Sequence, residues 1–167
     1  MGSGRSGRVT AGVFGWIHAS GVGEIADVGP GRFTGLKYVE ILEEVLLPSV
    51  RAMVYPDPEP FYFLHDNSPI HTCGVVQTWF SHHPEITVMP HPPKSPDLNP
   101  IEHVWAQMNK HIPENRHRTR ASVISSALEA WEQLRTPEGR ELTQALVASM
   151  PARLQDVLSA GGGYTKY

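Results

Sequence analysis

Apolar positions in the first third of the chain change from the spacing of strands to the spacing of helices. Residues 8–29 carry short alternating apolar segments around a glycine-containing turn at 19–23, which predicts two strands joined by a turn. Apolar residues at helical spacing follow from 36 to 46, with Thr34 as the predicted N-cap. Pro48 is expected to bend or end this helix. The aromatic and apolar run 61–66 ends in Asp66, which is typical of a buried strand.

The remainder of the chain continues with alternating helix and strand patterns, and then with helices. The patterns predict a helix over 72–83, a strand over 85–91 and a helix from 100 to about 111. Two more helices are expected at 120–134 and 139–159, with Pro151 interrupting the second. The predicted apolar faces comprise Val75, Val76, Trp79 and Phe80 in the first helix and Ile101, Val104, Trp105 and Met108 in the second. This order favours a mixed α/β sheet with helices on its faces.

Composition adds few constraints. With 167 residues, 40% of them hydrophobic and 19% charged, the chain is expected to form one globular domain with its own core. No apolar run is long enough to predict a membrane span, and no secretory signal is evident. The single cysteine, Cys73, cannot form an internal disulfide. The formal charge of −3 does not by itself indicate a nucleic-acid-binding protein.

Positive charge is nevertheless concentrated between residues 110 and 120. Lys110, Arg116, Arg118 and Arg120 lie in this short segment together with two histidines. Such a run is either a solvated loop or a patch that contacts phosphates, and the sequence leaves both interpretations open.

The segment PPKSPDLNPIEHVW, residues 92–105, constrains the backbone strongly just before a glutamate. Asn99 can be an N-cap, Pro100 suits the first helical position, and Glu102 can reach back to the N-cap amide as in a capping box. Helix capping is therefore one interpretation of Glu102. The other is that the rigid turn positions its carboxylate as a ligand.

Asp66 presents a similar choice. It is followed by turn-forming residues, including Asn67, and on its own it suits an Asx-turn. His71 can cap or pack against a helix, or it can orient a carboxylate. Between Asp66 and Glu102 lie 35 residues, which contain one predicted helix, one predicted strand and the proline-rich turn. A strand–helix–strand path returns to the same sheet edge, so the two carboxylates are predicted to converge there.

Two converging carboxylates form a hard, oxygen-rich site that suits Mg²⁺ or Mn²⁺. In two-metal nucleotidyl transfer such ions activate the attacking oxygen and stabilise the leaving one.

Four segments of the chain resemble transposases of the Tc/mariner superfamily. They are GRFTGLKYVEILEEVLLPSV (31–50), HDNSPIHT (65–72), SPDLNPIEHVW (95–105) and LVASMPARLQDVLSAGGGYTKY (146–167). The resemblance implies the RNase H-like fold of the DDE nucleases, and magnesium-dependent DNA cleavage and strand transfer during transposition. It also implies that Asp66 and Glu102 are the second and third members of the acidic triad, with Asn67, His71 and Asn99 as supporting residues.

The chain departs from this family pattern at its N-terminus. The family carries its first catalytic aspartate on an opening strand ahead of the hairpin, and residues 1–8 contain no acidic residue. We therefore expect an RNase H-like core that lacks the first strand over residues 1–112, and a C-terminal helical extension of the same domain over 113–167. As a truncated domain, it is expected to be inactive alone.

The alternative function is a non-catalytic module that binds nucleic acid or oligomerises. The expected partners are transposon-end and target DNA, a second copy of the chain or a full-length transposase, and no membrane. The resemblance implies a nuclear location in a eukaryotic host, and a cytoplasmic one otherwise.

Overall fold

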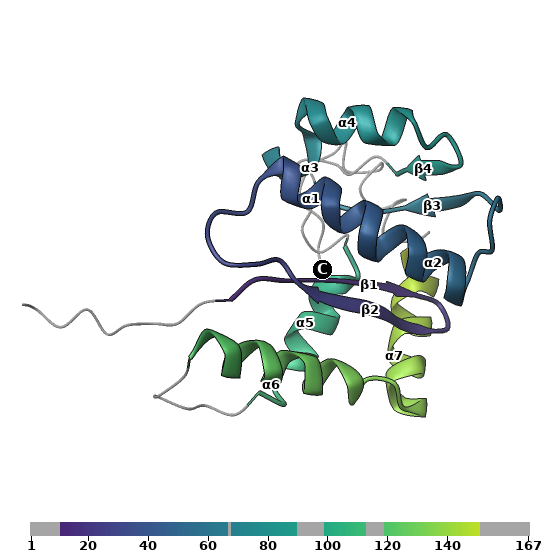
Figure 1. Cartoon of the computed structure of the whole chain (residues 1–167). Coiled ribbons are helices and arrows are strands. Elements are labelled where there is room, and N and C mark those ends of the chain that lie inside the picture. The colour runs from purple at the N-terminus through teal and green to yellow at the C-terminus, as the bar shows by residue number, and fades with distance from the viewer. Residues whose placement is uncertain (1–10, 67, 90–98, 113–118, 151–167) are drawn as a thin grey trace, which may run out of the picture.

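The computed structural model describes residues 11–66, 68–89, 99–112 and 119–150 (Figure 1). In chain order its elements are β1 (Val13–His18), β2 (Gly21–Asp27), α1 (Gly35–Ile41), the π-helical turn η1 (Leu42–Leu46), α2 (Leu47–Met53), β3 (Phe61–Phe63), α3 (Pro69–Thr72), α4 (Gly74–Ser81), β4 (Ile86–Val88), α5 (Ile101–Asn109), α6 (Arg120–Glu132) and α7 (Pro137–Ala148). The order of strands and helices agrees with the mixed α/β fold that the sequence predicts.

The strands form two separate ladders. β1 pairs antiparallel with β2, from Val13 opposite Asp27 to His18 opposite Gly21, as the alternating pattern predicts. β3 pairs parallel with β4 through α3 and α4, which confirms the predicted strand–helix–strand path. Within the described ranges no strand joins the two ladders, so the expected single sheet is divided between β1 and β3.

β3 is shorter and more exposed than predicted. The strand covers only residues 61–63 of the expected 61–66. Phe61 is buried, but the side chain of Tyr62 on the opposite face is 76% exposed. The prediction of a strand buried on both faces is therefore wrong, because no described element packs over Tyr62.

The long helical segment begins as predicted and continues further. Thr34 caps it by accepting a hydrogen bond from the Lys37 amide at 3.3 Å. Pro48 neither ends nor interrupts the helix, which runs to Met53. Proline lacks an amide hydrogen and clashes with the carbonyl four residues earlier in a regular α-helix. The wider π-helical turn directly before α2 accommodates this missing bond.

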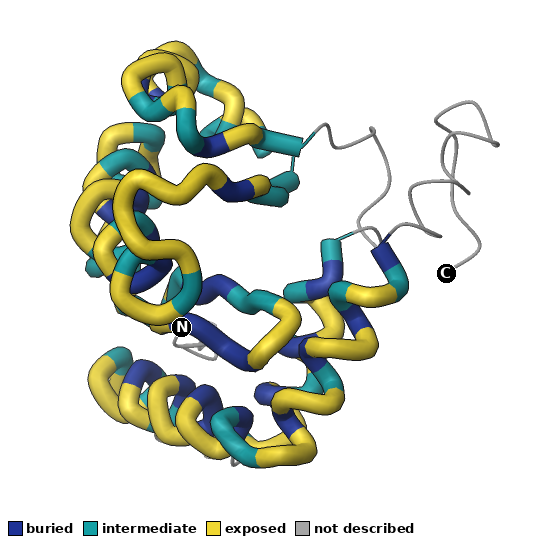
Figure 2. Tube along the Cα trace, turned by 90° about the vertical axis from the view of Figure 1, so that its right-hand side faces the viewer, coloured by how far each residue is buried: buried dark blue, intermediate teal, exposed yellow. Residues whose placement is uncertain are grey.

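The hairpin lies between two hydrophobic clusters (Figure 2). The first, here called cluster 1, has a buried centre formed by Trp16, Tyr38, Leu42, Leu46, Val50, Phe61, Val76, Trp79 and Ile86. The second, cluster 2, is centred on Val22, Val104, Met108, Ala127, Ala130, Trp131, Leu134 and Leu146. Alternation along β1 explains this division, because Phe14 and Trp16 pack in cluster 1 while Val13 and Ile17 pack in cluster 2.

Two hydrogen bonds tie the hairpin to the helices on either face. The indole of Trp16 donates to the Ser49 hydroxyl at 2.8 Å, and the indole of Trp131 donates to the Gly23 carbonyl at 2.9 Å. Both indoles are buried, so each N–H finds its partner within the protein. The hairpin is thereby fixed to η1–α2 on one side and to α6 on the other.

The later helices follow the predicted pattern with shifted ends. α5 buries Val104 and Met108 as expected, whereas Val75 in α4 is 39% exposed and does not belong to the apolar face. α7 is described to Ala148, and the predicted break at Pro151 lies outside the described residues. Across the described part of the chain, none of the helices combines the length and the apolar character needed to cross a bilayer.

Candidate active site

Asp66 follows β3 and is held by two hydrogen bonds to the same oxygen. Its Oδ1 accepts from the Ser68 amide at 2.9 Å, which forms an Asx-turn, and from His71 Nδ1 at 2.7 Å. Because an ionised carboxylate can only accept, Nδ1 of His71 is the protonated ring nitrogen in this contact. Of the two roles considered for His71, orienting a carboxylate fits its contacts. The side chain of Asp66 remains 47% exposed, and Asn67 lies outside the described residues.

The aromatic rings of Tyr38 and His65 pack against His71. The ring of His71 lies 4.4 Å from that of Tyr38 and 5.0 Å from that of His65, nearly parallel to the latter. The Tyr38 hydroxyl contacts His65 Nδ1 at 2.8 Å. Burial, with a smaller effect from the charge of Asp66, raises the pKa of Tyr38 well above its ordinary value, so the phenol stays neutral. The stack therefore fixes the imidazole that holds Asp66.

Sequence reasoning missed Tyr38 and His65. The helical pattern assigned Leu36 to the buried face, yet Leu36 is 66% exposed whereas Tyr38 is 1% exposed. The only signal in the sequence was the His65–Asp66 pair followed by His71, and it does not identify a partner 27 positions upstream of His65.

Glu102 lies in the first turn of α5, where local hydrogen bonds define its position. Asn99 Oδ1 accepts from the Ile101 amide at 3.3 Å, and the Asn99 carbonyl accepts from the Glu102 amide at 3.2 Å. Pro100, and not the predicted Asn99, occupies the N-cap position, so α5 begins one residue later than predicted. Burial of Val104 and Met108 anchors the same helix, while Glu102 itself is exposed. The prolines at 92, 93 and 96 lie outside the described residues.

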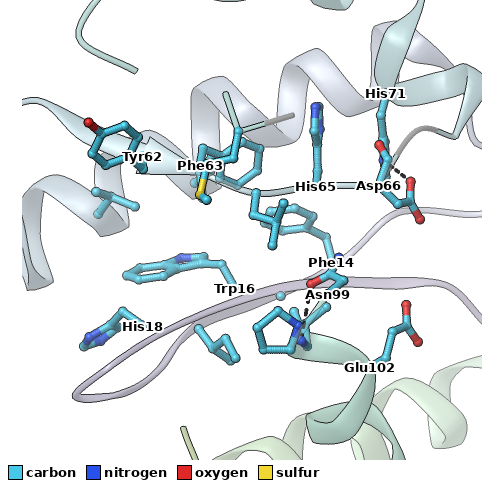
Figure 3. Close-up of a pocket in the computed structure, with 18 of the residues that line it drawn as sticks. Phe14, Trp16, His18, Tyr62, Phe63, His65, Asp66, His71, Asn99 and Glu102 are labelled. Atoms are coloured by element: carbon cyan, nitrogen blue, oxygen red, sulfur yellow. Dashed lines mark hydrogen bonds and ion pairs between the residues drawn. The ribbon is translucent and has the colours of Figure 1, made fainter. Parts of the chain in front are cut away.

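The two carboxylates face one cavity. Asp66, His71, Asn99 and Glu102 all line a cavity of about 800 Å³, and Figure 3 shows Asp66 and Glu102 together at one end of it. Two residues that are 36 positions apart in the chain are thus brought to one site. The chain path through α3, α4 and β4 accounts for this arrangement.

The basic segment is only partly described. Lys110 ends α5 and is exposed, whereas the Arg120 guanidinium forms an ion pair with Asp27 Oδ1. Hydrogen bonds from Arg120 and from the Gly29 amide hold the pKa of Asp27 below its ordinary value. Arg116 and Arg118 lie outside the described residues.

Comparison with known proteins decides the family. Residues 27–124, more than half of the chain, match the family described as DDE superfamily endonuclease. The chain belongs to this family. The Tcb1 transposase of Caenorhabditis briggsae is 33% identical over 130 residues, covering 78% of this chain and 45% of that protein. The Tc3 transposase of Caenorhabditis elegans is 30% identical over 138 residues, covering 81% of this chain and 40% of that protein.

Solved DDE transposase structures agree with the RNase H-like fold. The catalytic domain of Mos1 transposase with raltegravir and Mg matches with a TM-score of 0.76 and 25% identity, covering 93% of this chain and 77% of that chain. The Mos1 mariner paired-end complex with Mg matches with a TM-score of 0.75 and 25% identity, and the match covers 93% of this chain and 45% of that chain. The chain is thus a transposase DDE endonuclease domain of Tc1/mariner type, and it spans less than half the length of the curated relatives it matches.

DDE endonucleases use a divalent metal, and the Mos1 catalytic domain has been solved with Mg and with Mn. The oxygen donors of Asp66 and Glu102 suit such an ion. However, nowhere in the described part of the chain do three or more His, Cys, Asp or Glu side chains group closely enough to hold a metal. The residues present therefore fit the metal only in part.

Proposed function

We propose that this DDE endonuclease domain binds Mg²⁺ or Mn²⁺ between Asp66 and Glu102 and acts there on transposon DNA. The observation that supports this proposal is the position of both carboxylates at one end of one cavity. Two carboxylates at one site repel each other, and a divalent cation relieves that repulsion. A metal held by Asp66 and Glu102 would activate the attacking oxygen and stabilise the leaving oxygen in DNA cleavage and strand transfer.

The chain's own residues position the two ligands. His71 donates to one oxygen of Asp66 and limits rotation of the carboxylate. Asn99 and Pro100 set the start of α5 and therefore the place of Glu102. Such supporting contacts are typically worth 10- to 100-fold in metal affinity.

We further propose that the two carboxylates found in the described part of the cavity give, by themselves, weak metal binding and little nuclease activity. Metals in such sites are normally held by several protein oxygens, and each missing ligand lowers the affinity and the precision of the geometry. The isolated chain is therefore expected to bind Mn²⁺ with a Kd on the order of 1 mM.

Metal binding is the direct test of the site. Titration of Mn²⁺ followed by electron paramagnetic resonance should give saturable binding that Asp66→Asn or Glu102→Gln reduces by about tenfold or more. Glu138→Gln is the matched control, because Glu138 is an exposed glutamate in the first turn of another helix, α7. Equal loss in the control, or no loss in either site variant, would show that the metal does not bind there.

Activity is tested by nicking of supercoiled DNA with Mn²⁺. We expect cleavage close to background, unchanged by Asp66→Asn. Strong cleavage that Asp66→Asn abolishes would confirm the metal site and contradict the proposed need for a further carboxylate.

DNA binding near the two carboxylates is the second proposal, and the position of Lys110 favours it. Lys110, the C-cap residue of α5, follows Glu102 by eight residues, which corresponds to about 12 Å along the helix axis. DNA that passes Glu102 would therefore come within reach of this exposed lysine. Solved Mos1 relatives include a paired-end complex with transposon-end DNA, which supports a similar assembly of this chain.

Binding to a labelled transposon-end duplex should weaken steeply with salt, and Lys110→Gln should reduce the slope by about one unit. Arg140→Gln is the control, because Arg140 lies on α7 beside Gly21 of the hairpin turn and does not line the cavity. Binding that does not depend on salt would contradict phosphate contact.

A further inference from the structure

Tyr38 carries a hydroxyl group into a surrounding of aromatic and apolar side chains. The residue lies on α1 and is 1% exposed. Its ring meets the rings of Phe14 and Phe33 edge to face, with centroid distances of 6.3 and 6.1 Å. A phenylalanine has the same ring, and a buried hydroxyl costs free energy unless it forms a hydrogen bond. Packing alone therefore does not explain the oxygen of this side chain.

The hydroxyl of Tyr38 contacts the imidazole of His65. Its oxygen lies 2.8 Å from His65 Nδ1. Burial, with a smaller effect from the charge of Asp66, raises the pKa of Tyr38 well above its ordinary value, so the phenol keeps its proton at neutral pH. The ring of His65 also packs against Phe63 and Phe80, at centroid distances of 5.2 and 5.6 Å. One polar contact and two aromatic contacts thus fix the plane of this imidazole.

The fixed ring of His65 faces the ring of His71. The two imidazoles lie side by side (Figure 3), with centroids 5.0 Å apart and planes only 6° from parallel. The ring of Tyr38 lies 4.4 Å from that of His71. These two neighbours restrict rotation of the His71 ring, whose Nδ1 lies 2.7 Å from Asp66 Oδ1. The contacts therefore lead from a hydroxyl on α1 to the carboxylate that follows β3.

The hydrogen bond between His71 and Asp66 needs this support because water reaches both side chains. The side chain of His71 is 21% exposed and that of Asp66 is 47% exposed. A partly exposed pair contributes little by itself, since holding two side chains in one geometry costs conformational entropy. Buried neighbours that already hold one ring remove part of this cost. The position of Asp66 thus depends on groups that do not touch its carboxylate.

We propose that Tyr38 is a positioning residue for Asp66, and that its hydroxyl acts through the ring of His65 on the imidazole of His71. The hydroxyl, in addition to the aromatic ring, keeps Nδ1 of His71 directed at the carboxylate. The effect on His71 is independent of any metal. The consequence for metal binding rests on the proposed function.

Tyr38→Phe separates this role from a purely structural one, because it keeps the ring and removes the oxygen. A hydroxyl that only stabilises the fold would, on removal, lower the free energy of unfolding and leave His71 and the metal affinity unchanged. A hydroxyl that positions Asp66 would change all three. Thr143→Val is the matched control, since Thr143 is 1% exposed and its hydroxyl donates to the Arg140 carbonyl within α7 at 3.0 Å.

The tautomer of His71 is the first measurement. Long-range ¹H–¹⁵N correlation spectra of the metal-free chain are recorded at about pH 8, where an ordinary imidazole is neutral. We expect His71 to carry its proton on Nδ1 in the unchanged chain and in Thr143→Val. Tyr38→Phe should shift His71 to a mixture of both tautomers. A single Nδ1-protonated tautomer in Tyr38→Phe would overturn the proposal.

His65→Gln tests the route, because it removes the ring between the hydroxyl and His71. Alone it should also give a mixture of tautomers at His71, and adding Tyr38→Phe should change the mixture no further. Separate and additive effects of the two changes would overturn the route through His65. If far-UV circular dichroism shows that Tyr38→Phe does not fold, His65→Gln decides alone, and an unchanged His71 tautomer contradicts the proposal.

Mn²⁺ titration followed by electron paramagnetic resonance is the second measurement. Tyr38→Phe should raise the Kd about threefold or more, less than the 10- to 100-fold typical of a group that contacts the ligand itself. Thr143→Val should leave the Kd unchanged. Mixed tautomers of His71 together with an unchanged Kd would overturn the proposal, because Asp66 would then not depend on the imidazole.

The two measurements also separate this proposal from the proposed function. If the unchanged chain binds no Mn²⁺ through Asp66 and Glu102, but Tyr38→Phe releases the second tautomer of His71, the metal site is refuted and the positioning role is supported. If both carboxylates bind Mn²⁺ and Tyr38→Phe changes neither the tautomer nor the Kd, the positioning role is refuted and the metal site remains.

Discussion

The contact between Gly23 and Trp16 predicts a large effect of one added methyl group. A Cβ at Gly23 would lie 2.1 to 2.5 Å from three ring atoms of Trp16, well inside the distance that real side chains tolerate. Neither partner is free to move. The Trp16 indole donates to Ser49, while Trp131 and Arg135 both donate to the Gly23 carbonyl, at 2.9 and 2.7 Å.

Gly23→Ala should therefore destabilise the protein by about 3 kcal/mol. Overpacking in a well-packed core costs about 1–3 kcal/mol, and displacement of the indole would also break its buried hydrogen bond to Ser49, which costs about 1–3 kcal/mol. For a domain of this size, 1 kcal/mol corresponds to about 2–4 °C, so the Tm should fall by about 6–12 °C.

Urea and thermal unfolding followed by far-UV circular dichroism give the free energy of unfolding and the Tm. Gly74→Ala is the matched control, because a Cβ at this first residue of α4 meets nothing within 4 Å and should be neutral or slightly stabilising. Trp16→Leu in the Gly23→Ala background should recover part of the loss, since it removes the ring that clashes. A change below about 0.5 kcal/mol in Gly23→Ala would refute the argument from packing.

Three further changes test separate contacts. Ser49→Ala leaves the Trp16 indole N–H without its acceptor and should lower the free energy of unfolding in urea by about 1–3 kcal/mol, whereas an unchanged value would contradict the role of that bond. Burial lowers the pKa of His18 below its ordinary 6.5, so the unfolded chain binds the proton first and stability should fall below about pH 6.5. His18→Gln should flatten that fall when urea midpoints at about pH 5 and about pH 7.5 are compared. Arg120→Met removes a partly exposed ion pair with Asp27 and should lower the free energy of unfolding in urea by at most about 1 kcal/mol. The difference from the unchanged protein should shrink in high salt, which screens the pair.

Local patterns in the sequence predicted most elements, because those elements depend on contacts close in the chain. The hairpin and α5 follow from alternation and from helical spacing. The continuation of the helix past Pro48 was not predictable, since it depends on a π-helical turn that has no signature in the residue pattern. Division of the strands into two ladders depends on long-range packing, and for that reason periodicity could not indicate it.

The sequence predicted that the two candidate carboxylates meet at one site, but it did not predict the aromatic stack against His71. Asp66, Asn99 and Glu102 line one cavity, as the strand–helix–strand path implies. The stack of Tyr38 behind His71 brings α1 against α3, and only the packed structure shows this contact. Residue spacing thus carries information about which carboxylates converge, whereas the groups that orient them depend on tertiary contacts.

Structural and functional roles of the same residues are not alternatives at this site. The Asx-turn and the bond from His71 both use one oxygen of Asp66, so the contacts that shape the turn also orient the carboxylate. Asn99 likewise accepts hydrogen bonds from the Ile101 and Glu102 amides at the start of α5 and thereby positions Glu102. In both cases local hydrogen bonds place a carboxylate that we propose as a metal ligand.

The two proposed ligands nevertheless depend on different halves of the molecule. Asp66 follows β3, whose Phe61 belongs to cluster 1, whereas Glu102 belongs to α5, whose Val104 belongs to cluster 2. The distance between the carboxylates therefore depends on how firmly the hairpin between these clusters holds them. Loosening of the hairpin by Gly23→Ala should consequently weaken the Mn²⁺ binding measured by titration, although the change touches neither carboxylate.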